Sequence, residues 1–197
     1  MVNGNGQDRS AILDLRLALD QVEQLEANLD AEEIGDVVES ARTKLLELPS
    51  LSGTASQMKS LMKLNKLWKT TNRAVDEIAA RCDAIARRHP DTVLEVGTDP
   101  SEVKARAFYA KARLLISMIP AMNSFKRKGK YREAIDILET SLAAAPNQAT
   151  YLGIGLCRAQ LKDRQGAAAA YQACINLDDE TEYALEAARR QRDLGLR

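Results

Sequence analysis

The most constraining feature of this sequence is an apolar stripe of helical period between Gly129 and Asn147. Its members recur at steps of three and four, and charged side chains occupy the opposite face. Pro146 removes a backbone donor and disfavours helical geometry in the residue before it, so the helix should end there. We expect a turn at Gly129, then one amphipathic helix that needs similar helices as neighbours. The stripe consists of Tyr131, Ala134, Ile135, Leu138 and Leu142.

The pattern recurs about thirty-three residues later, close to the thirty-four of tetratricopeptide repeats. In the second copy the matching residues are Tyr151, Ile154 and Gly155 in a first helix, and Ala167 and Tyr171 in a second. In the first copy they are Met118, Ala121, Met122 and Phe125, followed by Ala134, Leu138 and Pro146. Residues 115–179 therefore resemble the tetratricopeptide repeat (TPR) family, and the C-terminal helix after them resembles its capping helix.

The resemblance implies helix pairs stacked as an α-solenoid, in which small residues such as Gly155 allow close helix packing. It also implies a concave groove lined by the first helices of successive repeats. Such a groove, apolar with a basic edge, fits an amphipathic helix or a peptide with an acidic flank. The N-terminal helices of the same chain are an alternative occupant. The implied lining is Ile119, Asn123, Lys126 and Arg127 from one repeat, and Leu152, Leu156, Ala159 and Gln160 from the next.

The rest of the chain also favours an all-α fold, with an N-terminal helical hairpin and a long helix ahead of the TPR-like solenoid. Residues 1–9 read as a flexible tail, and residues 10–90 as a helical bundle. Within this bundle we expect a hairpin ending at Pro49, a flexible connection over 49–56 and a long helix over about 57–88. After the break at 90–97, Asp99 is a helix cap followed by a proline, which starts a TPR-like domain over 99–197.

The long helix carries a seam at alternating steps of three and four, as coiled coils do. Two interpretations remain open: a core helix packed on the hairpin, which is favoured, or an oligomer seam that would make a homodimer. The proposed seam is Leu61, Leu64, Trp68, Val75 and Ile78.

The same helix has a basic stripe between Lys59 and Arg73, with no acidic residue before Asp76. The first hairpin is acidic, so pairing within the fold or simple solvation is favoured. The alternatives are an anionic membrane, an acidic partner or a nucleic acid.

Composition narrows the function classes. The chain of 197 residues has 28 basic and 28 acidic side chains, so no net charge points to nucleic acid or membrane. The first residues lack a secretory signal pattern and no apolar run would span a membrane, so a cytoplasmic location is expected. Cys82, Cys157 and Cys174 are widely spaced and fit buried apolar positions in a reducing compartment.

Catalytic motifs are sparse. His89 is the single histidine, which leaves no histidine-based triad or histidine-rich metal site within one chain. The cysteines lack metal-ligand spacing, and Gly153-Ile-Gly155 lacks the lysine of a phosphate loop. The sequence thus predicts no enzyme, no cofactor and no metal.

These observations predict a non-enzymatic adaptor or scaffold that binds a protein or peptide segment through a TPR-like groove. One alternative is a secretion-type chaperone that holds a client segment. Another is an assembly protein that oligomerises through the heptad helix, and a last one is a protein that binds a membrane or nucleic acid through the basic stripe.

Overall fold

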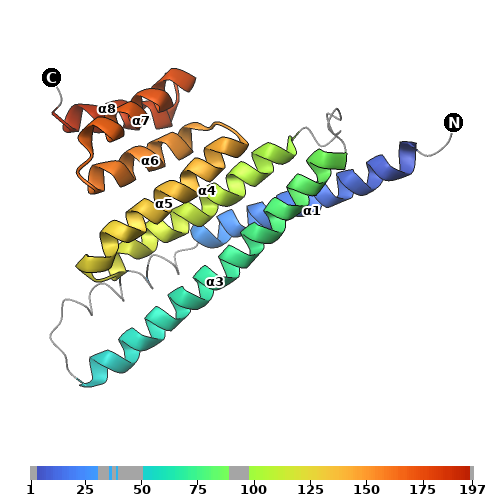
Figure 1. Cartoon of the computed structure of the whole chain (residues 1–197). Helices are drawn as coiled ribbons and strands as arrows, with labels where there is room; N and C mark the ends of the chain where they lie inside the picture. Colours follow the sequence, from blue (N-terminus) through green and yellow to red (C-terminus); the bar gives the residue numbers. More distant parts are fainter. Residues whose placement is uncertain (1–3, 31–35, 37–38, 40–50, 89–97, 196–197) are drawn as a thin grey trace.

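The computed structural model describes residues 4–30, 36, 39, 51–88 and 98–195, and this part of the chain is all-α (Figure 1). It forms seven α-helices and one short 3-10 helix, η1. The α-helices in chain order are α1 (Gly4–Asp30), α3 (Leu51–Arg88), α4 (Pro100–Met118), α5 (Ser124–Ala144), α6 (Gln148–Gln160), α7 (Arg164–Leu177) and α8 (Glu182–Asp193), and η1 (Ile119–Ala121) joins α4 to α5.

The N-terminal core lies between α1, α3 and α4. Leu15 and Val22 of α1, Val75 and Ile78 of α3 and Val103 of α4 are each fully buried in one apolar cluster. Two ion pairs between helices flank it. Arg81 of α3 lies 3.6 Å from Asp14, and Arg106 of α4 lies 2.6 Å from Glu26. The fourth helix is therefore a wall of the N-terminal core as well as the start of the C-terminal helices.

Helix boundaries differ from expectation at two places in this region. Helix α1 begins at Gly4, so the predicted tail over 1–9 is wrong from residue 4 onward. Helix α3 begins at Leu51, so most of the predicted connection over 49–56 is helical. The second helix of the predicted hairpin lies outside the described residues except for Asp36 and Glu39, which are helical and exposed.

The predicted break at 90–97 also lies outside the described residues, and the helix start after it is confirmed. Asp99 caps α4, accepting a hydrogen bond of 2.7 Å from the backbone N–H of Ser101. The Ser101 hydroxyl also donates to this carboxylate, and the hydrogen bonds from the hydroxyl and the backbone N–H lower the pKa of the Asp99 carboxyl. Because α4 packs on helices from both sides of the break, the regions 10–90 and 99–197 share a core.

The first predicted repeat is placed wrongly in its opening helix. Residues 118–125 do not form one helix, because Pro120 lies in η1 and Asn123 caps the start of α5. The partner of α5 is instead α4, and the two form a long antiparallel hairpin. Phe125, one of the residues matched to the first copy of the repeat, is 98% exposed.

The predicted turn at Gly129 is also wrong, since α5 runs through it without a break. Glycine costs a helix interior about 1 kcal/mol relative to alanine, and a helix of this length tolerates that cost. The predicted end is confirmed: α5 stops at Ala144, ahead of Pro146.

The second predicted helix pair is present as α6 and α7, and its close contact has the expected steric basis. A Cβ atom placed on Gly155 would lie 2.3 Å from Cε1 of Tyr171, which is impossible without movement. Tyr171 is buried beside Ala167 and Cys174. A larger side chain at position 155 would therefore separate α6 from α7.

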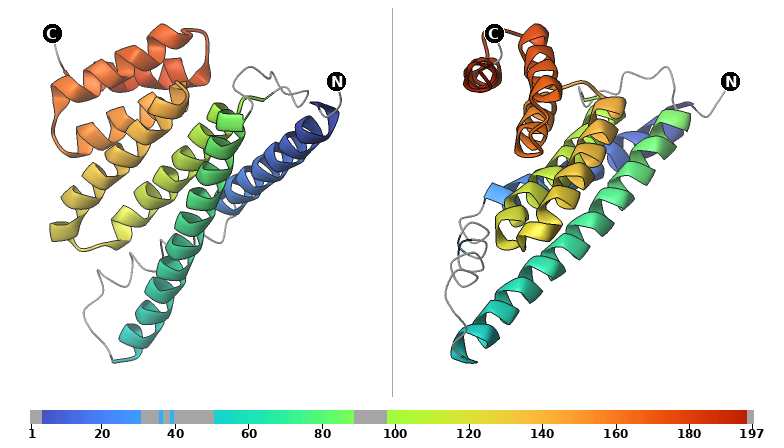
Figure 2. Two further views of the ribbon diagram at one scale, coloured as in Figure 1. Left: turned by 45° about the vertical axis from the view of Figure 1, so that its right-hand side comes forward. Right: turned by 60° about the vertical axis from the view of Figure 1, so that its left-hand side comes forward.

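From α4 to α8 each helix packs against the one before it, and α6 also contacts both α4 and α8 (Figure 2). A buried polar junction ties the first three together. The Ser141 hydroxyl of α5 donates to the carbonyl of Ala105 in α4 at 2.7 Å and lies 3.2 Å from the Thr150 hydroxyl of α6. Asn147, the α6 cap, accepts from Thr150, so the junction fixes how α6 leaves α5.

Candidate functional site

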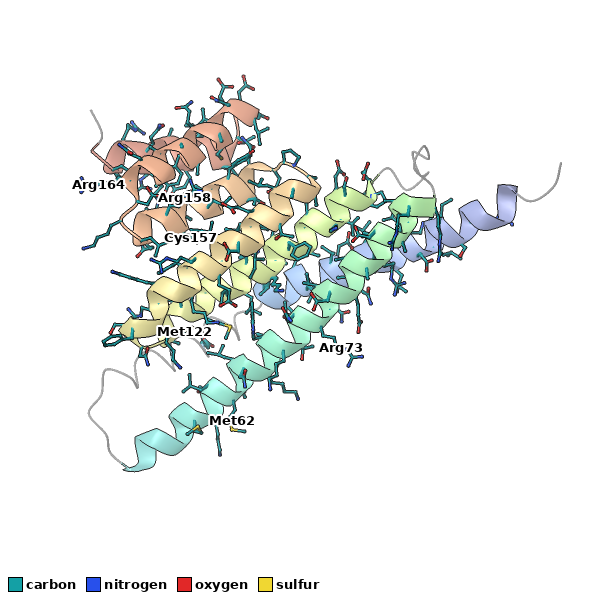
Figure 3. The ribbon with its side chains drawn as sticks, viewed as in Figure 1. Met62, Arg73, Met122, Cys157, Arg158 and Arg164 are labelled. Carbon is teal, nitrogen blue, oxygen red and sulfur yellow. The ribbon has the colours of Figure 1, made fainter. Side chains whose placement is uncertain are left out.

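One concave site in the described part of the chain is a groove between the N-terminal half of α3 and the turn that joins α4 to α5, which we call the α3–α5 groove. It has a volume of about 280 Å³ and an apolar floor. In Figure 3 Met122 projects from the α4–α5 turn, beside α3. The groove is lined by Leu61, Leu64, Asn65 and Trp68 of α3, Leu115 and Met118 of α4, Ala121 of η1, Met122, and Lys126 and Lys130 of α5.

The α4–α5 turn is held in shape by two local devices. The Asn123 side chain accepts a hydrogen bond of 3.1 Å from the Lys126 N–H, which satisfies a free donor at the start of α5. The Arg127 guanidinium donates to the carbonyls of Met122 at 2.9 Å and Pro120 at 3.0 Å. These bonds fix the turn that carries Met122, so one wall of the groove is preorganised.

Trp68 lies where two of the apolar clusters meet, and it is half-buried. Lys111 Nζ of α4 lies 5.9 Å from the centroid of its ring, within the range of a cation–π interaction. It is the single tryptophan of the chain, so all tryptophan fluorescence comes from a side chain that lines this groove.

The rim of the groove is cationic. Lys130 pairs with Glu133 at 2.6 Å, whereas Lys126 is exposed and forms no ion pair with the described residues. An apolar floor beside a free cation favours a ligand with an apolar face and an acidic edge.

The basic stripe predicted on α3 does not pair with the acidic residues described in α1. Its lysines are exposed to solvent, and Arg73 pairs at 2.8 Å with Glu77 of the same helix. The ion pairs that join α1 to its neighbours use Arg81 and Arg106 instead. The exposed lysines of the stripe are Lys59, Lys63, Lys66 and Lys69.

The residues predicted for the TPR-like groove do not lie together on one open surface. Ile119 is fully buried in η1, so its assignment to a groove is wrong. Asn123 and Arg127 stabilise the α4–α5 turn, and only Lys126 lines the α3–α5 groove.

The four remaining predicted residues are all on α6. Leu152 and Ala159 pack against the cluster around Tyr171, between α6, α7 and α8. Leu156 is half-buried and Gln160 is exposed.

The predicted oligomer seam divides between core and groove. Val75 and Ile78 are fully buried against α1 and α4, and Leu64 is 3% exposed against the end of α4. An intermolecular role is wrong for these three residues because their contacts are within the chain. Leu61 and Trp68 line the groove and stay partly accessible.

The cysteines are buried free thiols. Burial raises the pKa of Cys82 to about 11 and that of Cys157 to about 12, and it also raises the pKa of Cys174. All three are therefore protonated at neutral pH, where a nucleophile or metal ligand would need the thiolate. The described residues contain no group of three or more His, Cys, Asp or Glu side chains arranged for a metal ion.

Sequence reasoning missed the contribution of the α4–α5 turn to the groove. Met118 and Met122 were expected within a repeat helix, whereas Lys130 was expected on the basic edge of the TPR-like groove. One signal was available: the sequence from Val103 to Arg132 contains basic residues but no acidic one. Such a run next to Pro120 indicates an exposed cationic turn.

Comparisons with known proteins add no relative: no family model, curated protein or solved structure matches this chain. Among the described residues, no helix is long and apolar enough to cross a membrane.

Proposed function

We propose that this protein is a non-enzymatic adaptor that binds an amphipathic helical segment of a partner protein in the α3–α5 groove. The observation that carries the proposal is the pairing of a floor containing Trp68, Met118 and Met122 with a rim containing Lys126. Methionine and tryptophan are common at surfaces that bind apolar helix faces, since methionine adapts its shape and tryptophan contributes a large contact area.

The neighbouring helices support the same function. Helices α4 to α8 pack successively on one another, and an array of stacked helix pairs of the kind that the TPR resemblance implies would offer a surface for protein segments. In this chain, however, α3 lies beside the first helix pair and supplies four of the ten residues that line the groove. A bound helix would therefore contact α3 and α5 together.

The test uses two synthetic peptides of the same helical design, each with one leucine stripe. One peptide has glutamate beside the stripe, and the other has lysine at the same positions. We expect the acidic peptide to shift Trp68 emission in a saturable way and to bind at least tenfold tighter than the basic peptide, because of Lys126 and its lysine neighbours.

Two charge reversals make this test specific. Lys126→Glu should weaken binding of the acidic peptide, whereas Arg164→Glu on the exposed start of α7 should leave it unchanged. Met122→Glu should abolish binding of both peptides while helical circular dichroism is retained. Equal binding of both peptides, or acidic-peptide binding that survives Met122→Glu, would contradict the proposal.

A further inference from the structure

Two stretches that contain no acidic residue come together beside the groove. One is α3 from Leu51 to Val75, and the other runs from Val103 to Arg132. Both line the α3–α5 groove, so they are neighbours in space as well. The described part of the chain thus carries a local positive field, although the whole chain has no net charge.

Much of the basic charge near the middle of α4 is already paired. Lys104 lies 2.6 Å from Asp83, and Arg106 lies 2.6 Å from Glu26. Most lysines nearer the α4–α5 turn and the start of α3 are exposed and form no ion pair with described residues. They are Lys59, Lys63, Lys126 and Lys128, whereas Lys130 pairs with Glu133. This end of the described chain therefore carries positive charge that no ion pair with described residues neutralises.

Large apolar side chains are exposed at the same end. Phe125 is 98% exposed in the first turn of α5, and Met62 and Met58 of α3 are 65% and 60% exposed. Figures 1 and 2 show the N-terminal end of α3 reaching past the α4–α5 turn, and Figure 3 shows Met62 projecting from it. We call this surface the cationic tip, and define it by Lys59, Met62, Lys63, Phe125, Lys126 and Lys128.

We propose that the cationic tip binds the surface of a bilayer that contains anionic phospholipids. An apolar side chain that projects among lysines can enter the boundary between headgroups and acyl chains, while the lysines stay beside the phosphates. The two attractions reinforce each other, because both groups project from one end.

A bilayer fits these observations better than a nucleic acid. Contacts to the phosphates of DNA or RNA use the lysines but leave the exposed methionines in water. Met62 on α3 and Phe125 on α5 belong to separate helices, as expected for insertion into a continuous apolar layer. The proposal is independent of peptide binding, since the tip adjoins the groove but its apolar members Met62 and Phe125 do not line it.

The test is co-sedimentation of the full chain with vesicles of phosphatidylcholine, with and without phosphatidylserine. We expect binding only to the vesicles with phosphatidylserine, falling steeply as salt is raised. Phe125→Ser should reduce the partition coefficient about tenfold or more. Leu185→Ser should not, although Leu185 of α8 is also exposed, at 63%.

Charge is tested by a second matched pair. Lys63→Glu should weaken vesicle binding roughly tenfold, because it removes one favourable charge and adds a repulsive one. Arg164→Glu, far along the chain on α7, should have little effect. All four variants should keep the helical circular dichroism of the parent, since each position is exposed.

Three outcomes would overturn the proposal. One is equal binding to neutral and anionic vesicles, and another is the same loss from Phe125→Ser and Leu185→Ser. The third is binding to a DNA oligonucleotide that depends on Lys63 but not on Phe125, with none to vesicles, which would assign the tip to nucleic acid. The acidic peptide is also titrated into the Phe125→Ser variant, with Trp68 emission as the signal. This titration shows whether the groove still binds peptide when vesicle binding is lost.

Discussion

At the scale of single residues, two glycines in helices have opposite surroundings. A Cβ atom on Gly155 would meet the ring of buried Tyr171 at 2.3 Å, whereas a Cβ atom on Gly129 would have no atom within 4 Å. Glycine is therefore required for packing at position 155 and only weakens the helix at position 129. The same substitution should have opposite signs at the two positions.

We predict that Gly155→Ala lowers the free energy of unfolding by about 1–3 kcal/mol, because the α6–α7 contact is overpacked. Gly129→Ala should raise it by about 0.5–1 kcal/mol through helix propensity. Urea unfolding followed by circular dichroism measures both. A neutral Gly155→Ala would mean that α6 and α7 are further apart than the structure shows.

Single residues also show which packing positions could be predicted from the sequence. The Gly155 and Tyr171 positions were identifiable because a repeat pattern places a small residue opposite a large one. Phe125 was misassigned because that pattern was extended across Pro120 and Asn123. A proline followed by a good cap ends one helix and starts another, and this local signal outweighs a weak periodic match.

At the scale of elements, one side chain of α6 links α7 to the start of α8. The Gln148 amide of α6 donates to the carbonyl of Cys174 at 2.9 Å and accepts from the Thr181 hydroxyl at 2.9 Å. Thr181 in turn caps α8. The buried residues of α8 are Ala184 and Ala187, which contribute little apolar area.

We predict that Gln148→Ala loosens α8 selectively, at a cost of about 1 kcal/mol in the free energy of docking. Amide hydrogen exchange should become faster over Glu182–Asp193 and stay unchanged in α4 and α5. Gln160→Ala, at an exposed position of the same helix, is the control. A uniform change along the chain would show that α8 unfolds only with the whole molecule.

The ends of helices were predictable where they depend on side chains close by in the sequence. The caps and prolines located the start of α4 and the end of α5. The partner of α5 was not predictable, because apolar periodicity shows that a helix has a buried face but not which helix covers it. The apolar seam of α3 likewise predicted that one face of this helix is buried. The packing of α1 and α4 against that face shows that it is buried within one chain.

At the scale of the whole molecule, α3 buries one face within the chain between Leu64 and Ile85. Val75 and Ile78 have no exposed surface, and they contact both α1 and α4 in the N-terminal core. The heptad pattern thus serves intramolecular packing, and stability should not depend on association.

We predict that Val75→Glu lowers the free energy of unfolding by about 3 kcal/mol or more, because it buries a charge without a partner. The urea midpoint of the parent should be the same over a wide range of protein concentration. Ala80→Glu, on the exposed face of α3, should be nearly neutral. Light scattering could instead show that the parent is a dimer and that Val75→Glu is a folded monomer. That result would support the intermolecular interpretation of the α3 seam.

The position of α4 also has a consequence for synthesis of the chain on the ribosome. The apolar faces of α1 and α3 close their core only with Val103 and Ala107 of α4, which emerge later. Chains grow at about 5–20 residues per second, so these faces stay in water for several seconds. Nascent chains that end before α4 are therefore the species most exposed to aggregation and most in need of a chaperone.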